Sequence, residues 1–301
     1  MRIAVAATPE VAIPTLNWLY ESEHEIALVI SQPDRPAGRG REIRSSAVSR
    51  WAIERNLPLL HPQTPQELVG VINDLDLVLT IGYGVLLPEI ILKLPRHGFL
   101  NLHFSLLPAY RGAAPAQRAI EHGEVFSGVT VFALDKGMDT GPIYSSAQAE
   151  IQPDWRTQEL LPVLADMGPR VVAAAFAAIE KGIAPTPQIG LTTLAPKISR
   201  LEARIDWNHK AEVIVRRIRA FYPQPVAWSE FQGGVFKITA ATAFNALIAP
   251  GQIRVIENNV VVGCGQGSAL ALLRVLPAGK KEMVGLDWVR GAHLDEGAHL
   301  G

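Results

Sequence analysis

The chain has 301 residues, more than one typical domain, and a formal net charge of -1 at pH 7. Apolar residues make up 48% and charged residues 19%, the proportions of an ordinary soluble globular protein. The near-neutral charge excludes a general attraction to polyanions, so nucleic-acid binding would need a local patch, and the single Cys264 excludes an internal disulfide or a cysteine-based zinc site.

The N-terminal half alternates between short apolar runs and helix-like segments. The first run, RIAVAA, is followed by Pro9 and Glu10, so we interpret it as a strand and not as a signal peptide. Runs that are apolar on both sides predict strands covered on both faces, hence an open parallel α/β sheet of the Rossmann-like type. The predicted strands are 2–7, 25–31, 76–83, 99–104, 127–135 and 142–151, and the predicted helices are 10–22, 46–56 and 157–183. No apolar stretch approaches the roughly 20 residues that a bilayer span needs, so we expect a cytoplasmic protein without membrane contact.

The composition changes after the long helix. Residues 185–207 carry three prolines and little periodicity, as a linker would. A predicted helix at 210–221 precedes short alternating strands within 233–244, 251–265 and 268–276, a pattern that favours a small β-barrel or sandwich, and we expect an OB-like barrel. We therefore expect a catalytic domain at 1–189, a linker at 190–205 and a C-terminal β-barrel domain at 206–301.

Two polar residues stand at the end of the fourth predicted strand. Asn101 and His103 are two residues apart, so both project from one face, and that face meets the usual ligand crevice of an open α/β sheet. An amide can donate a hydrogen bond to a developing oxyanion, and an imidazole can accept or return a proton near neutral pH. Together they suit attack on an acyl carbon. The chain has no G-x-S-x-G elbow, so we expect the nucleophile to belong to the substrate.

A carboxylate is the expected third member of this site. Asp139 lies in KGMDTG, a glycine-flanked loop that can bring its side chain back over the same crevice to orient the imidazole. Taken singly, each feature has an ordinary structural explanation: N-x-H as a satisfied polar cluster, D-x-G as a turn and SLLP as a stiffened buried loop. Only their combination indicates an acyl-transfer site, and the spacing does not identify the substrate.

NLHFSLLPAYRGAAPAQRAI, followed by GVTVFALDKGMDTGPI, resembles the signature of the 10-formyltetrahydrofolate-dependent formyltransferases. The resemblance implies that Asn101, His103 and Asp139 form the catalytic set. It also implies that 10-formyltetrahydrofolate is the co-substrate, without a metal. The implied folate-binding residues are Ser105, Leu106, Leu107 and Pro108, with the backbone of Ile81, Gly82, Tyr83 and Gly84 around the pterin ring. Ala7, Val11 and Phe104 depart mildly from the family pattern.

SQPDRPAGRGR is similar to a basic loop found in those family members that act on initiator tRNA, and KISRLEARIDW, APGQI and AGKKEM are similar to their linker and C-terminal domain. The resemblance implies formyl transfer to the α-amino group of methionyl-initiator tRNA for translation initiation, by a monomer. The residues expected to bind tRNA are Arg35, Arg39, Arg41, Arg44, Arg216, Arg217, Lys280 and Lys281.

Three alternatives remain at this point. A formyltransferase acting on a nucleotide-linked amino sugar, or on another small amine, would share the catalytic set but would not need the basic loop. A folate- or tRNA-binding module without catalysis would not need all three catalytic side chains. A dinucleotide-dependent oxidoreductase fits the sheet pattern poorly, because the first strand-helix turn lacks G-x-G-x-x-G.

Overall fold

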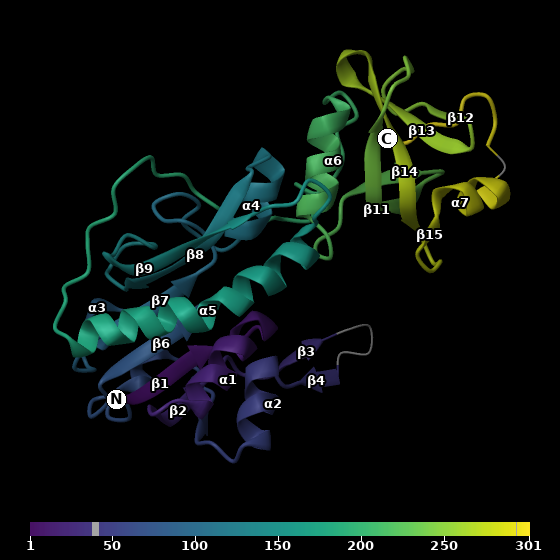
Figure 1. Cartoon of the computed structure of the whole chain (residues 1–301). Coiled ribbons are helices and arrows are strands. Elements are labelled where there is room, and N and C mark those ends of the chain that lie inside the picture. The colour runs from purple at the N-terminus through teal and green to yellow at the C-terminus, as the bar shows by residue number, and fades with distance from the viewer. Residues whose placement is uncertain (38–41, 293) are drawn as a thin grey trace. The chain divides into compact units, whose positions relative to one another are not determined.

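The computed structural model describes residues 1–37, 42–292 and 294–301 (Figure 1). They form two compact units. The first unit comprises 1–115, 126–150 and 161–196, and the second comprises 116–125, 151–160 and 197–301. The change of unit after residue 196 falls inside the expected linker. The two short segments 116–125 and 151–160, which we expected in the first domain, group with the second unit.

The first unit is built on a seven-stranded sheet with the order β5-β2-β1-β6-β7-β8-β9. Its strands are β1 (Arg2–Ala7), β2 (Glu25–Ile30), β5 (Leu59–Leu60), β6 (Leu77–Ile81), β7 (Phe99–His103), β8 (Phe126–Ala133) and β9 (Ile143–Glu150). A separate two-stranded pair, β3 (Arg35–Ala37) and β4 (Glu42–Arg44), follows β2. The expected strands are confirmed within a residue or two, and β5 and the β3–β4 pair had no clear apolar signal.

The sheet is mixed and not wholly parallel, which corrects the expectation of an open parallel sheet. Strands β5, β2, β1, β6 and β7 run parallel, whereas β7 and β8, and then β8 and β9, pair antiparallel. The loop between β8 and β9 is too short to hold the dozen or more residues of a parallel crossover, so those two strands must form a hairpin. This hairpin places the loop that carries Asp139 beside β7.

Helices and loops cover both faces of the sheet. The helices of the N-terminal half are α1 (Ile13–Glu21), α2 (Ala47–Glu54), α3 (Glu89–Leu92), α4 (Pro115–His122) and α5 (Thr157–Glu180), with short 3-10 turns at Glu10–Ala12 and Pro65–Leu68. On one face, Gly168 of α5 lies against Thr15 of α1 and Leu102 of β7, where a Cβ atom would collide. On the other face, Ala4, Val78 and Phe99 join a buried cluster with Leu68 and Ile91.

Helix α5 corrects the expectation about apolar stretches. By length and composition alone it is apolar enough to cross a membrane. The apolar run was missed because Pro162, Pro169 and the exposed Asp166 and Arg170 interrupt it without ending the helix. Its buried residues recur at helical spacing, as at Leu160, Leu164, Val171 and Phe176, so one face packs on the protein and α5 is a core helix.

The second unit contains a six-stranded antiparallel sheet with the order β10-β11-β14-β13-β12 and with β15 paired to β14. Its strands are β10 (Trp228–Phe231), β11 (Gly234–Phe244), β12 (Ile253–Ile256), β13 (Asn259–Cys264), β14 (Ser268–Pro277) and β15 (Met283–Val284). Its helices are α6 (Ala211–Ala220) and α7 (Gly285–Ala292), with a 3-10 turn at Gly265–Gly267, and residues 116–122 of α4 and the first turn of α5 also group with it. The alternating strands are therefore confirmed as a small antiparallel β domain.

Candidate active site

Strand β7 carries the polar pair to the carboxyl edge of the sheet. Phe99 belongs to the buried cluster under α3, and Asn101 and His103 follow it in steps of two, so all three share one face. Leu100 and Leu102 point to the opposite face and are buried there. The expected placement of Asn101 and His103 on one side of a strand end is confirmed.

His103 is buried and held by its own loop. Its Nε2 lies 2.9 Å from the carbonyl oxygen of Tyr110. Since a carbonyl only accepts, Nε2 carries the hydrogen and donates it. In the neutral imidazole the lone pair is therefore on Nδ1, which lies 3.6 Å from Oδ2 of Asp139. The edge of the His103 ring also meets Phe132, with ring centroids 6.4 Å apart.

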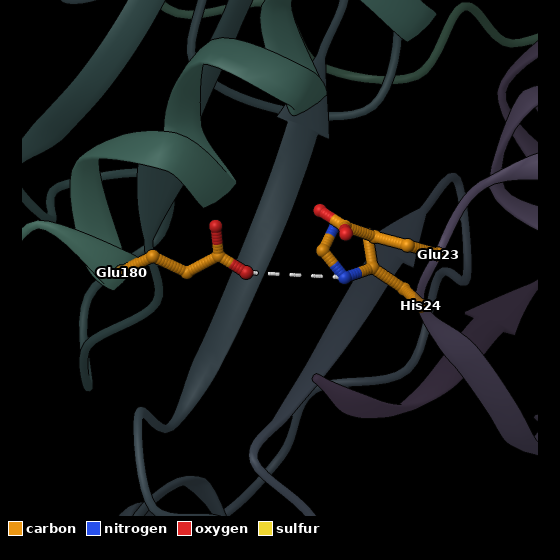
Figure 2. Close-up of side chains that lie close together, drawn as sticks. All are labelled: Glu23, His24 and Glu180. Carbon is orange, nitrogen blue, oxygen red and sulfur yellow. Dashed lines mark ion pairs between the residues drawn. The ribbon is translucent and has the colours of Figure 1, made fainter.

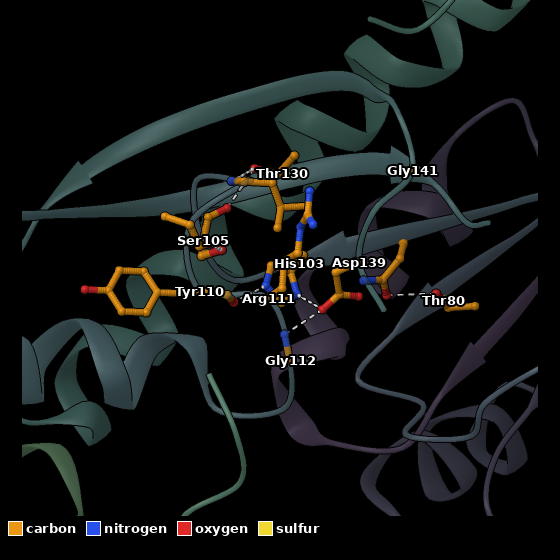
Figure 3. Close-up of polar contacts among 12 residues, drawn as sticks. Thr80, His103, Ser105, Tyr110, Arg111, Gly112, Thr130, Asp139 and Gly141 are labelled. Atoms are coloured by element: carbon orange, nitrogen blue, oxygen red, sulfur yellow. Dashed lines mark hydrogen bonds and ion pairs between the residues drawn. The ribbon is translucent and has the colours of Figure 1, made fainter. Parts of the chain in front are cut away.

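Asp139 reaches this site from the loop between β8 and β9, as expected. Its Oδ2 accepts a 2.7 Å hydrogen bond from the backbone N–H of Gly112 and faces His103 (Figure 3). The loop turns at Asp139 itself, which has a left-handed φ of 55°. Within the same loop, Asp135 Oδ1 accepts hydrogen bonds from the backbone N–H of Gly137 at 2.9 Å and from the hydroxyl of Thr140 at 2.6 Å.

Burial and charge act in opposite directions on His103. Desolvation lowers the pKa of the imidazole below its ordinary value, while the carboxylate of Asp139 and the Tyr110 carbonyl raise it, and burial dominates. The imidazole is therefore neutral at pH 7, with a free lone pair on Nδ1. Once Nδ1 takes a proton, Asp139 attracts the resulting charge. This arrangement suits a general base that later acts as an acid.

Asn101 is oriented by its neighbour on β6. Thr80 and Asn101 are paired in the parallel ladder, and the Thr80 hydroxyl lies 2.8 Å from Asn101 Oδ1 and 3.0 Å from the carbonyl of Leu100, so its hydrogen is shared between these two acceptors. The amide oxygen is thereby occupied, and the NH₂ group is left to donate on its other side. Asn101 lines the same pocket as His103 and Asp139, so its N–H groups are available to an oxygen that binds there.

The three side chains line a pocket of about 410 Å³ in the first unit. Other walls come from Gly82 to Leu87, Phe104, Gly112, Ala113, Leu134 and Met138. Gly82 is exposed at this wall and has a φ of 56°, and a side chain there would collide with Pro9, so the position requires glycine. Among the expected folate residues, Gly82, Tyr83 and Gly84 lie at the pocket, whereas Ile81 is fully buried in β6.

The SLLP segment lies mainly behind the pocket. The Ser105 hydroxyl donates to the carbonyl of Ala109 at 2.6 Å, and the Thr130 hydroxyl donates to the carbonyl of Ser105 at 2.7 Å. Leu107 and Pro108 are buried, and Leu106 packs over Gly128. The segment thus shapes the loop between His103 and Gly112, while Phe104 and not SLLP forms the wall. Folate contact by these four residues stays a prediction.

Four further residues belong to the site and were missed in the sequence. Thr80 orients Asn101, Tyr110 holds His103 and Gly112 holds Asp139. Thr80 is a polar residue inside the apolar run 77–81, and this break in the run could have indicated a residue of the site. Gln188, which bonds to the Asp139 loop, lies in a segment that reads as a linker and gives no such signal.

The eight basic residues expected to bind tRNA fall into four groups, the last of which lies on α6. Arg39 and Arg41 lie outside the described residues. Arg35 and Arg44 pair across β3 and β4, so their backbones stand side by side at the base of that loop. Lys280 and Lys281 are exposed at the turn before β15.

Arg216 and Arg217 on α6 are engaged in a network within the second unit. Arg216 Nε donates to the carbonyl of Glu121 at 3.2 Å, and Arg217 Nη2 donates to the carbonyl of Glu202 at 2.5 Å. Arg217 also lies 3.4 Å from a carboxylate oxygen of Glu121. These contacts give both arginines a structural task, and their contact with RNA stays a prediction.

A second group of titratable side chains lies at the amino-terminal edge of the sheet, away from the pocket. Glu23, His24 and Glu180 each offer a possible ligand atom, and these atoms lie within 4.8 Å of one another (Figure 2). However, His24 Nδ1 already contacts the N-terminal amine at 3.2 Å, and its ring packs on Trp18 and Phe176. We interpret the group as a tie between the start of β2 and the end of α5.

The remaining thiol cannot serve as a nucleophile. Cys264 is buried in the second unit, and desolvation raises its pKa to about 12, so it is protonated at pH 7.

The fold is that of a formyl transferase. The formyl transferase family model matches residues 1–176, and the model of the formyl transferase C-terminal domain matches residues 197–293. A methionyl-tRNA formyltransferase of Streptomyces griseus is 40% identical over 311 residues, covering 100% of both chains. The chain therefore belongs to the methionyl-tRNA formyltransferase branch of this family, and α5 is a core helix of a soluble enzyme.

Solved structures share the fold. WlaRD, a sugar 3N-formyl transferase crystallised with dTDP and 5-N-formyl-THF, has a TM-score of 0.68 at 19% identity, covering 93% of this chain and 99% of its own. HypX from Aquifex aeolicus, in complex with tetrahydrofolic acid, has a TM-score of 0.66 at 19% identity. That match covers 96% of this chain but only 46% of HypX.

Proposed function

We propose that this enzyme transfers the formyl group of 10-formyltetrahydrofolate to the α-amino group of methionyl-initiator tRNA, in the cytoplasm and as a monomer. The observation that carries the proposal is the pair of buried His103 and partly buried Asp139 beside Asn101 in a pocket, within a chain similar over its full length to methionyl-tRNA formyltransferases.

The pocket fits a folate. Its lining exposes mainly apolar side chains, and the exposed backbone of Gly82 and Gly84 can offer hydrogen-bonding groups to the edge of a flat ring. The folate, when bound, supplies the formyl carbon. Phe104, Leu134 and Met138 would pack on it, and the polar side chains lie together at one place in the pocket.

The chain's own residues account for the proton transfers. Asn101 donates to the formyl oxygen as negative charge develops there, and one such donor contributes roughly 3 kcal/mol to transition-state stabilisation. Nδ1 of His103 takes the proton that the attacking amine loses. As the C–N10 bond breaks, the same Nδ1 returns the proton to N10, so no net proton is gained or lost. Asp139 stabilises the imidazolium between these two steps.

The experiment is formyl transfer from 10-formyltetrahydrofolate to methionyl-initiator tRNA, followed with the unmodified enzyme and with His103→Ala. We expect transfer by the first and a loss of about 10²-fold or more in the second, since general acid–base catalysis contributes 10²–10⁴-fold. Transfer to a nucleotide-linked amino sugar, with none to tRNA, would overturn the proposal.

A further inference from the structure

Residues 186–195, which we call the strap, run past both catalytic loops of the first unit. At one end, Thr186 and Ile143 exchange two backbone hydrogen bonds of 2.7 and 2.8 Å beside the Asp139 loop. At the other end, Ala195 donates to the carbonyl of Arg111 at 2.7 Å and accepts from Ala114 at 3.0 Å. A segment that reads as a linker is thus bonded like a short edge strand.

Gln188 is the side chain by which the strap reaches the Asp139 loop. Its Nε2 donates to the carbonyl oxygens of Asp139 and Gly141, each at 2.8 Å. Its Oε1 accepts from Arg111 Nε at 3.2 Å and from Arg111 Nη2 at 2.6 Å. Both amide hydrogens and the amide oxygen are therefore engaged, on two loops that meet at the active site.

The hydrogen bonds of Gln188 lie on both sides of the contact between Gly112 and the Asp139 carboxylate. Arg111 precedes Gly112, whose N–H holds Asp139 Oδ2. Gln188 thus joins the backbone of Asp139 to the residue beside its side-chain partner. Asp139 needs such support because a left-handed conformation costs a non-glycine residue about 1 kcal/mol or more. Without the amide, the loop keeps the Gly112 hydrogen bond to the Asp139 carboxylate and the contacts of Asp135, but it loses the hydrogen bonds to the backbone carbonyls of Asp139 and Gly141.

We propose that Gln188 is a positioning residue that keeps the Asp139 carboxylate against Nδ1 of His103. The inference rests on the proposed function, in which that carboxylate stabilises the imidazolium. A merely structural alternative is that Gln188 fixes the strap and has no effect on the catalytic pair. The two accounts differ in whether the effect of Gln188 passes through Asp139.

The first test compares Gln188→Ala and Gln188→Glu with the control Ile189→Ala. Ile189 is the next strap residue and is 89% exposed. We expect kcat to fall about 10–100-fold in Gln188→Ala, since a misplacement of about 1 Å can cost 10²-fold, with KM for both substrates nearly unchanged. Gln188→Glu should lose at least as much, because its carboxylate would face two carbonyl oxygens. An unchanged kcat in Gln188→Ala overturns the proposal.

A double-mutant cycle with Asp139→Asn separates positioning from structure. If Gln188 acts through Asp139, the Gln188→Ala change should cost less than about threefold in the Asp139→Asn background, because coupled residues are not additive. Equal losses in both backgrounds would overturn the proposal. Thermal unfolding of each variant identifies any loss that comes from the fold.

The pKa of His103 gives a readout that does not require turnover. His103 faces Asp139, the Tyr110 carbonyl and the Phe132 ring, and the other titratable groups lining the pocket are Asp135 and Tyr83. If the Asp139 carboxylate moves away from His103 in Gln188→Ala, it raises the pKa of the imidazole less. The pKa of His103 should therefore fall, which NMR titration of the imidazole would detect. An unshifted pKa would contradict the positioning role. If the unmodified enzyme does not transfer formyl groups to tRNA but the pKa of His103 still falls in Gln188→Ala, only the proposed function is overturned.

Discussion

At the scale of single residues, the two ring nitrogens of His103 have different tasks. Nε2 is committed to the Tyr110 carbonyl, and only Nδ1 faces the carboxylate of Asp139. Proton transfer at this site therefore has one available nitrogen. The carboxylate influences that nitrogen directly, because it lies on the same side of the ring.

Asp139→Asn tests this division of tasks. The amide can place an N–H on the Nδ1 lone pair and no longer attracts a proton there, so kcat should fall by about 10²-fold. Because Asp139 raises the pKa of His103, its neutralisation lowers that pKa, and the acidic limb of the kcat/KM profile should move to lower pH. Asp166→Asn, on the exposed side of α5, is the control and should leave the profile unchanged. An acidic limb that stays in place would contradict the pairing.

Thr80→Val tests whether Asn101 needs its neighbour. Valine has nearly the shape of threonine but cannot donate to Asn101 Oδ1, so the amide is free to rotate. We expect kcat to fall about tenfold, against about 10²–10³-fold for Asn101→Ala, which removes the donor itself. Both variants are assayed for formyl transfer and thermal unfolding. Equal losses in kcat would show that the hydroxyl contributes something other than orientation.

The sequence predicted the polar side chains that line the site better than the residues that hold those side chains in place. Asn101 and His103 were predicted from a two-residue spacing, because strand geometry fixes which side chains share a face. The tautomer of His103 could not be predicted, because it depends on the direction of the Tyr110 carbonyl. That direction follows from the left-handed conformation of Tyr110, which has a φ of 62°. Gln188 depends on a contact across 49 positions, for which one sequence gives no sign.

At the scale of secondary-structure elements, α6 is tied to residues 116–125 by charges. Arg118 Nη1 lies 2.6 Å from carboxylate oxygens of both Glu121 and Glu202, and the arginine side chain is only 8% exposed. Arg217 on α6 contacts the same two glutamates, through the carboxylate of Glu121 and the carbonyl of Glu202. The network holds segments together that are distant in sequence but lie in one unit.

Arg118→Met should destabilise the protein by about 3 kcal/mol at pH 7, because removing one partner leaves poorly hydrated carboxylates unpaired. The hydrogen bond to Arg118 lowers the pKa of Glu202 below its ordinary 4.5, so this stabilisation is present above that value and is lost as the pH falls through the lowered pKa. The difference between the two proteins in urea unfolding should therefore shrink in acid.

Arg290→Met is the matched control for that prediction. Arg290 pairs with Asp287 at 3.0 Å, but its side chain is 76% exposed. Removing it should change the free energy of unfolding by less than about 1 kcal/mol at either pH, as is usual for surface pairs. Equal destabilisation by the two changes would show that burial does not decide the contribution of Arg118.

The direction of strands was harder to predict than their positions. Apolar runs located β1, β2, β6 and β7 because a strand buried on both faces needs them. The same signal cannot distinguish a parallel neighbour from an antiparallel one, and only the short loop between β8 and β9 indicates the hairpin. In α5, the helix continues through Pro162 and Pro169, which a reading of apolar runs treats as interruptions.

At the scale of the whole molecule, tRNA binding should depend on dispersed positive charge. Lys280→Ala with Lys281→Ala should weaken tRNA binding and make its salt dependence shallower by one to two units in the slope of log K against log salt, roughly 0.9 for each phosphate that the protein no longer neutralises. Formyl transfer at saturating tRNA should keep its rate. Filter binding across a salt series gives the slope, and an unchanged slope would exclude these lysines from the interface.

The division into units was predicted only in outline from the sequence. A change in composition near residue 190 indicated a boundary, and the units change after residue 196. The grouping of 116–125 and 151–160 with the second unit follows from ionic and backbone contacts such as Arg118–Glu202. Such contacts are long-range, and no local pattern of apolar or polar residues reports them.

The strap also sets the place at which the two halves of this enzyme can be recombined. A chimera whose C-terminal half began directly after α5 would receive a foreign strap, and the loops of Arg111 and Asp139 would meet unfamiliar partners. A junction after Pro196 would leave the strap with the loops it supports. Transfer of the catalytic site as a module therefore requires about a dozen residues of apparent linker to travel with it. A junction after Pro196 also needs matched partners for Arg118, because its ion pair with Glu202 crosses that point in the sequence.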